Sequence, residues 1–449
     1  MSTIDTTDTS ITFHGGVGSV TGANFLLEGV GYKLLVDCGM FQGTREAEAK
    51  NMETFPYDVT SVHFLCVTHS HMDHIGRIPL LMKAGFKGVI YSTPETRSIA
   101  ELMLADAERI MQFNSRKTGK TPIYGSQDVH NAFVHWQTIP YHTPKKLTET
   151  LSVTLKDAGH ILGSSMFEFA CADSDGKTIK VLFTGDLGNS PSLLLPDTEF
   201  VTDVDYIVID SVYGDRNHES KDQREDKFKD AILRAIKRKG TLIIPAFSLE
   251  RTQTIIYQIN NWVEEGIIPQ IPVFIDSPLA ISLTDIYERV TGLYNDDVQN
   301  DIAGGDKIFN FPKLKETVQS MDSKHIHTVA DPKIIIAGSG MSTAGRVLHH
   351  EERYLPDENA TVLLMGYQAP ETLGRDLQEG NKEVYIHDKK VKVRATIETI
   401  NGYSAHKDSD HLVEFVEHAN TGNLKKVFVV MGSQNLHFFL LKDFTMSLL

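Results

Sequence analysis

The stretch "THSHMDHIGRIP" at positions 68–79 places three histidines and an aspartate within six residues, directly behind the apolar run "VHFLCV". The apolar run predicts a buried strand, and "GRIPLLMKAGF" has the three- and four-residue apolar spacing of a helix. On extended backbone between the two, His69 and His71 can reach one point. Asp73 and His74 follow at the helix start and can address a second point a few ångströms away. The arrangement predicts a two-metal site.

Two further ligands are expected from distant turns. His160 lies in "DAGHILGSS" and Asp186 ends a strand in "LFTGDLGN", so both are flanked by glycine. A carboxylate has two oxygens and can bridge two ions. A lone His-x-His pair would be read as an ordinary surface or core pair, but this larger set favours metal chemistry. Because the ligands are nitrogen and oxygen without thiolate, zinc is the leading choice, with manganese or iron as alternatives.

Length and composition limit the class of protein. A chain of 449 residues is too long for one hydrophobic core, so two domains are expected. No apolar stretch reaches the roughly 18–20 residues needed to span a bilayer, and the N-terminus lacks a secretory pattern. Cys38, Cys66 and Cys171 are widely separated, which argues against a disulfide framework. We expect a cytoplasmic protein without a membrane partner.

The formal net charge of −15 argues against a protein that coats nucleic acid. It does not exclude a nuclease, because bound divalent metals can draw phosphate into an acidic protein. Local basic runs stand at 116–120, 234–240 and 388–394. Each run is either a solvated face or the border of a polyanion groove.

A second series of strand and helix patterns begins near position 219. The apolar runs "TLIIPAF", "PVFIDS" and "KIIIAGS" alternate with helical segments, which predicts a second α/β unit with a mostly parallel sheet. The sequence shows no repeat, no low-complexity segment and no long flexible linker. We therefore expect two units that are woven together.

The run Thr-His-x-His-x-Asp-His, together with "VDCGMFQG", "DAGHILGS" and "TGDLGN", resembles the metallo-β-lactamase superfamily. The resemblance implies an α/β fold, the αβ/βα sandwich, with two metals at one edge. It assigns His69, His71, His160 and Asp186 to the first metal, and Asp73, His74 and Asp186 to the second. It also implies that Asp37 steadies the histidine loop.

Six later landmarks resemble the β-CASP nucleases, the branch that includes the nuclease subunit of the cleavage and polyadenylation complex and its bacterial and archaeal relatives. The landmarks are "IDSVYGDR", "PAFSLERTQTIIY", "IDSPLA", "GSGMSTAGRVLHH", "GYQAPETLGR" and "NGYSAHKDSD". This resemblance implies a β-CASP domain at 209–391, inserted into a metallo-β-lactamase domain built from 1–208 and 392–449.

By the same resemblance Asp73, Asp210 and His406 carry catalysis. A histidine near the metals can protonate the leaving oxygen of a phosphodiester, and an aspartate beside it can orient that histidine and favour its charged form. The contacts to substrate phosphate are expected from Ser339, Arg346, Arg375 and Ser404, for which a purely structural role is the alternative.

One departure concerns motif C of the family, a His-Gly-Glu whose histidine ligates the second metal. Here "VFVVMGSQN" supplies Met431, Gly432 and Ser433. Methionine is a poor ligand for a hard divalent ion, so the second metal should lose one protein ligand. The final stretch "NLHFFLLKDFTMSLL" has no recognisable pattern.

The sequence therefore indicates a metal-dependent ribonuclease that hydrolyses single-stranded RNA through a metal-activated water. A DNA-directed β-CASP nuclease, a small-molecule metallo-hydrolase and a catalytically weak scaffold are the alternatives. A homodimer is left open.

Overall fold

The computed structural model describes residues 9–432, which form two compact units. Within that range, unit 1 comprises the residues up to Ser192, Asp197–Asn217 and the residues from His406 onward. Unit 2 comprises Leu193–Pro196 and His218–Ala405. Ser433 and the final stretch lie outside the described residues. The expected domain boundaries at 208/209 and 391/392 stay a prediction.

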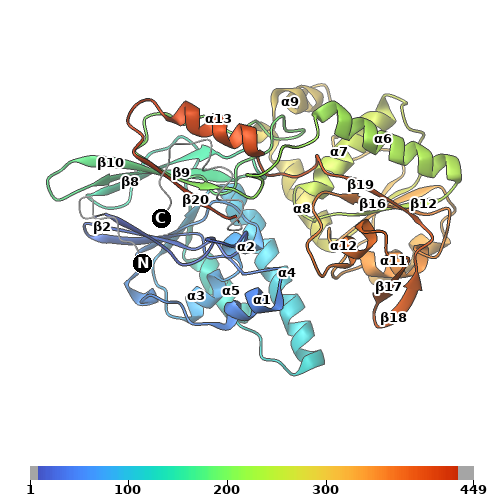
Figure 1. The fold of residues 1–449 in the computed structure, drawn as a ribbon, viewed down its shortest axis with the longest axis horizontal. Helices are drawn as coiled ribbons and strands as arrows, with labels where there is room; N and C mark the ends of the chain where they lie inside the picture. Colours follow the sequence, from blue (N-terminus) through green and yellow to red (C-terminus); the bar gives the residue numbers. More distant parts are fainter. Residues whose placement is uncertain (1–8, 433–449) are drawn as a thin grey trace. The chain divides into compact units, whose positions relative to one another are not determined.

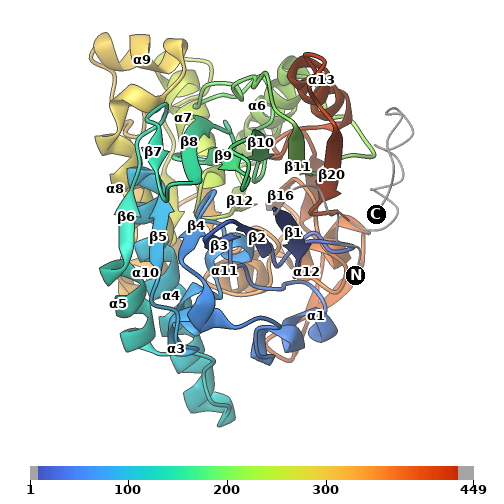
Figure 2. The same ribbon diagram turned by 90° about the vertical axis from the view of Figure 1, so that its left-hand side faces the viewer.

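Unit 1 contains two six-stranded sheets. In spatial order the first holds β1 (Ser10–Phe13), β2 (Phe25–Gly29), β3 (Tyr32–Val36), β4 (Phe64–Cys66), β5 (Val89–Ser92) and β6 (Trp136–Thr138). The second holds β20 (Lys426–Val430), β11 (Tyr206–Asp210), β10 (Thr178–Phe183), β9 (Ser165–Ala172), β8 (Leu151–Asp157) and β7 (Lys145–Lys146). The sheets lie one above the other in Figure 2.

Alternation along the strands explains why the two sheets pack face to face. Side chains on successive strand residues point to opposite faces. Leu34 and Val36 of β3 accordingly join Phe167 and Phe169 of β9 in the core between the sheets. Leu35, between the two β3 residues, belongs to a separate core on the other face.

Helices cover the outer faces of both sheets, which gives the αβ/βα sandwich (Figure 2). Against the first sheet pack α2 (Met72–Ile75), α3 (Ile78–Lys83), α4 (Pro94–Thr118) and α5 (Ser126–Val134). Against the second sheet packs α13 (Ser409–Ala419), through Leu412, Phe415 and Val416. A short helix, α1 (Arg45–Ala49), precedes the strand β4. The predicted fold class is confirmed.

Strand direction decides where the predicted site residues meet. The strand β9 is antiparallel to both β8 and β10, and β10, β11 and β20 are mutually parallel. The strands β8, β10, β11 and β20 therefore run in one direction. Their carboxyl ends lie at one edge of the sheet, and His160, Asp186, Asp210 and Met431 stand at or just beyond those ends.

Unit 2 is built on a six-stranded sheet in which every pairing is parallel, as the sequence predicted. Its order is β14 (Leu314–Glu316), β13 (Val273–Asp276), β15 (Lys333–Ala337), β12 (Thr241–Pro245), β16 (Thr361–Met365) and β19 (Thr396–Ile400). Its helices are α6 (Lys221–Arg238), α7 (Arg251–Glu264), α8 (Pro278–Arg289), α9 (Asp296–Ala303), α10 (Ser320–His325), α11 (Val347–Tyr354) and α12 (Leu373–Gln378) (Figures 1 and 2).

A separate hairpin, β17 (Glu383–Ile386) with β18 (Lys389–Lys392), packs on the same core as α11. That core joins Val384, Ile386 and Val391 of the hairpin to Val347 and Tyr354 of the helix. None of the helices between residues 9 and 432 combines the length and apolar character of a membrane span.

Candidate metal centre

Asp37 fixes the histidine loop, the segment that carries His69, His71 and His74. Asp37 directly follows β3 and is fully buried. The Asp37 carboxylate accepts hydrogen bonds from the Thr68 backbone N–H at 2.8 Å and from the Thr68 hydroxyl at 2.8 Å. It also lies 2.7 Å from Nδ1 of His74. Since Nδ1 of His74 is engaged, its Nε2 is the nitrogen that faces the site.

Glycines allow the turns that carry His160 and Asp186 to approach each other closely. A Cβ atom on Gly188 would lie 1.8 Å from the carbonyl oxygen of Gly159, so no larger residue fits at position 188. The Gly188 N–H donates to the carbonyl of Ala158 at 2.9 Å. The glycine flanks noted in the sequence therefore bring two ligand turns together.

Four ligand atoms converge at the first predicted point. Nδ1 of His71 lies 3.1 Å from Nε2 of His69 and 3.2 Å from Nε2 of His160. The Asp186 Oδ2 atom lies 3.5 Å from Nε2 of His69 and 3.7 Å from Nε2 of His160. These four side chains come from three separate turns, and three of them are buried.

The spacing of these atoms fits a coordinated ion. Two ligand atoms that each lie about 2.0–2.1 Å from one zinc ion, at tetrahedral angles, are about 3.3–3.4 Å apart. The observed separations of 3.1 to 3.7 Å bracket that value. The residues present therefore fit a divalent metal with three nitrogen ligands and one oxygen ligand.

A second group of ligand atoms shares Asp186. Its other oxygen, Oδ1, lies 3.4 Å from Nε2 of His74, and Nε2 of His74 lies 3.9 Å from Oδ2 of Asp73. Both Nε2 of His74 and Oδ1 of Asp186 are buried without a hydrogen-bond partner among the described residues. Buried polar atoms of this kind are rare unless a ligand meets them. The structure thus brings together all six side chains that the sequence nominated as metal ligands.

The pKa values of the site histidines shift in two different directions. Burial lowers the pKa of His69 and brings that of His71 to about 3, so both imidazoles are neutral and keep a lone pair for a metal. Burial also opposes the charged form of His74, but the carboxylates of Asp186 and Asp37 raise its pKa. A divalent cation and a proton therefore compete for His74.

Asp210 and His406 lie beside the first group. Asp210 ends β11, is fully buried, and accepts a hydrogen bond from the Leu187 N–H at 3.1 Å. Nδ1 of His406 lies 3.9 Å from Oδ2 of Asp210 and 3.7 Å from Oδ2 of Asp186. Burial alone would lower the pKa of His406, but these two carboxylates raise it. The arrangement favours a protonated imidazole next to the candidate metals.

The predicted phosphate contacts all belong to unit 2, where several are engaged internally. The Arg346 guanidinium donates to the buried Asp276 carboxylate at 2.7 Å and to the Thr317 carbonyl at 2.6 Å. Arg375 pairs with Glu379 at 2.7 Å on an exposed helix face. These contacts favour the structural alternative for Arg346 in particular, and its substrate-binding role stays a prediction.

The remaining two predicted contacts are serines. The Ser339 hydroxyl accepts from the Thr343 N–H at 2.9 Å and so shapes its own glycine-rich turn. Ser404 is buried. For both residues the substrate-binding role stays a prediction.

Sequence reasoning missed Thr68. Its hydroxyl lies 3.1 Å from Nδ1 of His69 and donates to Asp37, so Thr68 links the buried carboxylate to the first histidine of the loop. Its place directly before His69 was the available signal, because a side chain there lies beside the first ligand.

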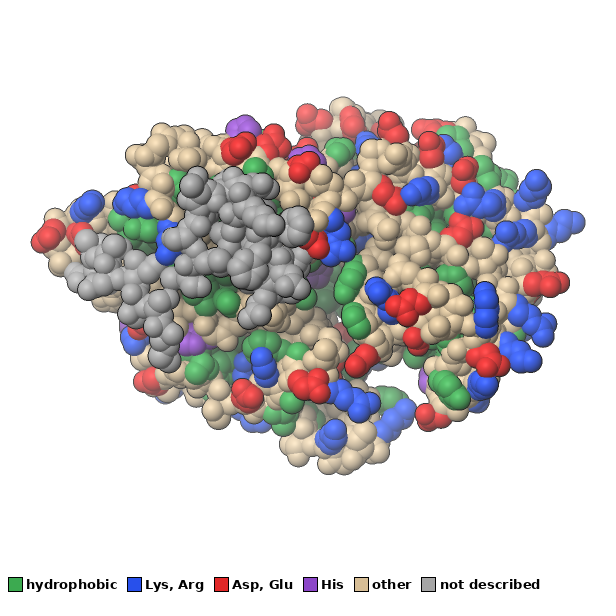
Figure 3. Space-filling view, viewed as in Figure 1, with side chains coloured by type: hydrophobic (Ala, Val, Ile, Leu, Met, Phe, Trp, Pro, Cys, Tyr) green, Lys and Arg blue, Asp and Glu red, His purple; other side chains and the backbone are tan. Residues whose placement is uncertain are grey.

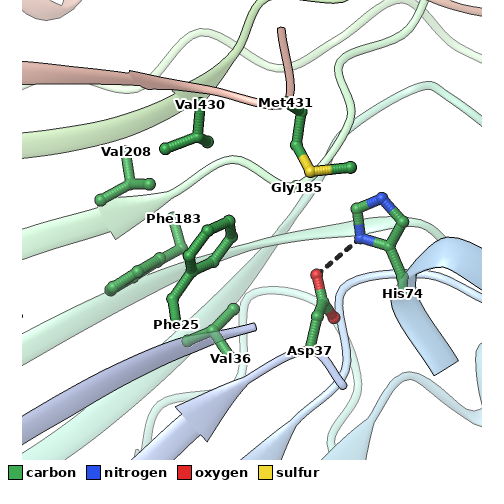
Figure 4. Close-up of a pocket in the computed structure, with 9 residues that line it drawn as sticks. All are labelled: Phe25, Val36, Asp37, His74, Phe183, Gly185, Val208, Val430 and Met431. Carbon is green, nitrogen blue, oxygen red and sulfur yellow. Dashed lines mark hydrogen bonds and ion pairs between the residues drawn. The ribbon is translucent and has the colours of Figure 1, made fainter. Parts of the chain in front are cut away.

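Met431 borders a small cavity beside His74. The cavity is lined by Phe25, Val36, Asp37, His74, Phe183, Gly185, Val208, Val430 and Met431. Figure 4 shows the Met431 thioether reaching toward the His74 ring, opposite the Asp37 hydrogen bond. A Cβ on Gly16 would come within 2.7 Å of the Met431 sulfur, so glycine at position 16 leaves the room that this side chain occupies. Ser433, the third residue of this motif, lies outside the described residues.

Family models match three parts of the chain. Residues 26–186 match the metallo-beta-lactamase superfamily domain, residues 252–377 the Beta-Casp domain, and residues 390–435 the Zn-dependent metallo-hydrolase RNA specificity domain. The first and third matches flank the second, as expected for an insertion.

Curated relatives align over most of the chain. It is 32% identical to Ribonuclease TTHA0252 of Thermus thermophilus, with 90% of this chain and 89% of the relative aligned. It is 30% identical to the RNase J-like protein of Methanocaldococcus jannaschii, over 90% and 88% of the two chains. Transcription termination factor FttA of Methanococcus maripaludis is 30% identical, but the match spans 61% of that longer protein.

A solved structure shares the fold. The crystal structure of a protein of unknown function from Enterococcus faecalis aligns with a TM-score of 0.52 over 95% of this chain and 94% of that one, at 12% identity. At that identity the likeness concerns the fold alone.

The cavity at Met431 generates a prediction about the second ion. With a thioether beside His74 in place of a nitrogen ligand, the Asp73, His74 and Asp186 group should bind metal more weakly than the His69 group. The Met431→His variant should raise affinity at the second position roughly tenfold or more, while Met431→Leu should leave it unchanged. Metal titration against a chromophoric chelator measures both. If the natural protein binds two ions with equal affinity, and Met431→His leaves both affinities unchanged, another residue must be the ligand at the second position.

Proposed function

Because the chain belongs to the β-CASP branch of the metallo-β-lactamase superfamily, we propose that it is a metal-dependent ribonuclease acting on single-stranded RNA. The observation that carries the proposal is the convergence of His69, His71, His160 and Asp186 at spacings suited to a divalent ion. The names of two relatives that align over most of their length, a ribonuclease and an RNase J-like protein, support the substrate class.

The proposed cofactors are two divalent ions, with zinc as the expected element and manganese or iron as alternatives. His69, His71, His160 and Asp186 would hold the first ion, and Asp73, His74 and Asp186 the second. Such a pair lowers the pKa of water and neutralises charge on a phosphoryl group. The contribution of the chain is to fix the ligands through Asp37 and Thr68, so that little rearrangement accompanies binding.

Proton delivery to the leaving oxygen is assigned to His406. Its pKa is raised by Asp210 and Asp186, which favours the protonated imidazole that a proton donor needs. Asp210 is held by the Leu187 N–H, which gives the His406–Asp210 pair a defined position beside the candidate metals. A phosphodiester releases a poor alkoxide unless that oxygen is protonated, and His406 supplies the proton.

The basic runs of unit 2 support an RNA partner. The helix α6 packs beside β19, and Arg238 donates to the Thr396 hydroxyl at 2.5 Å, so the run at 234–240 lies beside the strand that follows the run at 388–394. Figure 3 shows Lys and Arg side chains gathered there, with acidic side chains among them. Exposed members are Arg234, Lys237, Arg238, Lys239, Lys389, Lys390, Lys392 and Arg394. The run at 116–120 instead ends α4, where cations complement the helix dipole.

The first test uses end-labelled single-stranded RNA and DNA of one sequence. The metal-loaded protein should cleave the RNA, lose activity with chelator and regain it when divalent metal is restored. A variant that keeps the fold but lacks a ligand, His69→Ala, should be inactive. Preferential cleavage of DNA would replace the proposal with a DNA-directed nuclease. Cleavage of neither strand, by protein with its metals in place, would overturn nuclease function.

A second test isolates proton donation. The His406→Ala variant should keep its metal content but lose on the order of 10²–10⁴ in the single-turnover cleavage rate, the usual worth of general acid catalysis. The matched control is His411→Ala, a partly exposed histidine on α13 that pairs with Asp408. The loss should shrink on an RNA whose leaving oxygen is replaced by sulfur, which departs without a proton. An unchanged rate in His406→Ala would return that residue to a structural role.

A further inference from the structure

A second group of metal-binding side chains lies in unit 2. One ligand atom from each of His349, Glu352 and His387 lies within 4.8 Å of the others. The rings of His349 and His387 have centroids 4.9 Å apart, and Nδ1 of His387 lies 3.3 Å from Oε2 of Glu352. Two imidazoles and one carboxylate are a recurring zinc ligand set that leaves a fourth position for water.

Two different elements bring these side chains together. His349 and Glu352 are three residues apart on α11, which places them on one face of the helix. His387 lies in the two-residue turn between β17 and β18, because Ile386 pairs with Lys389. The apolar face of the hairpin packs into the same core as Val347 and Tyr354 of the helix. The position of the turn against α11 is thus fixed by packing.

The conformation of the turn is one that histidine rarely adopts. His387 and Asp388 have φ values of 50° and 62°, the left-handed conformation that two-residue hairpin turns require and that usually selects Asn-Gly. A histidine at the first of these positions directs an imidazole toward the helix instead.

The carboxylate of the cluster is paired with a lysine, with which an incoming cation must compete. Lys389 donates to Glu352 at 2.7 Å, so an ammonium already occupies one oxygen of the carboxylate.

We propose that His349, Glu352 and His387 form a divalent metal site of the zinc class that ties the β17–β18 hairpin to α11. The site is separate from the His69 group, since it belongs wholly to unit 2. It is partly exposed, so the ion exchanges with solvent and occupancy follows the free metal concentration. The proposal does not depend on the proposed ribonuclease function.

The consequence is local rigidity. The hairpin has only two strands and depends on its packing against the α11 core, because a two-stranded ribbon alone is marginal. A metal that joins its turn to a helix would slow opening of the hairpin. Because the metal would hold the turn before β18, it would also restrict the exposed lysines of that strand, Lys389, Lys390 and Lys392.

The test measures hydrogen exchange of the hairpin in the full-length protein by mass spectrometry, with and without Zn²⁺. In the natural protein Zn²⁺ should slow exchange of the amides at 383–392 several-fold. His349→Ala and His387→Asn should abolish that effect while leaving exchange without metal unchanged, since alanine suits a helix and asparagine tolerates the turn. The matched control, His325→Ala, changes an exposed histidine of the same unit outside the cluster and should behave like the natural protein.

A titration supplies the second readout. Zn²⁺ affinity at one site should fall roughly tenfold or more in His349→Ala and His387→Asn, while cleavage of a short RNA stays unchanged because the His69 group is intact. Zn²⁺ that leaves hairpin exchange unaltered in the natural protein overturns the proposal. Equal Zn²⁺ stoichiometry and affinity in the natural protein and both variants also overturns it.

Discussion

The site in unit 1 depends on one constraint: three imidazole nitrogens and one carboxylate oxygen, most of them on buried side chains, point at one another. Each neutral imidazole has one donor nitrogen and one acceptor nitrogen, so Nε2 of His69, Nδ1 of His71 and Nε2 of His160 all present lone pairs in only one combination of tautomers. Burial keeps His69 and His71 neutral. A cation shared by the three nitrogens and the Asp186 carboxylate would select that combination and use all of these lone pairs at once.

The rest of unit 1 positions these ligand atoms. Parallel strands of the second sheet end at one edge and deliver His160, Asp186 and Asp210 there, and β3 and β4 of the first sheet deliver Asp37 and the histidine loop. The two sheets are held face to face by interleaved aromatic and aliphatic side chains. Ligands on the ends of packed strands are placed more firmly than ligands on free loops.

Much of this was predictable from local pattern. The ligand residues are crowded in one short stretch or flanked by glycines, and parallel-sheet strands read as apolar runs, so "THSHMDH" and "TLIIPAF" were informative. Contacts between segments that are distant in the sequence could not be predicted from local pattern. Arg346 looked like a phosphate contact because it follows a glycine-rich turn, yet its guanidinium meets Asp276 from a distant strand. The cluster of His349, Glu352 and His387 joins a helix to a hairpin turn, and the spacing of these residues in the sequence does not indicate it.

The most direct test of the central claim is a crystal structure of the metal-loaded protein with diffraction recorded on both sides of the zinc absorption edge. If these side chains hold zinc, an anomalous peak should lie about 2.0–2.2 Å from Nε2 of His69, Nδ1 of His71, Nε2 of His160 and an oxygen of Asp186. Ordered water in that position, with the imidazoles hydrogen-bonded to it and no anomalous signal after metal loading, would show that they do not bind the metal.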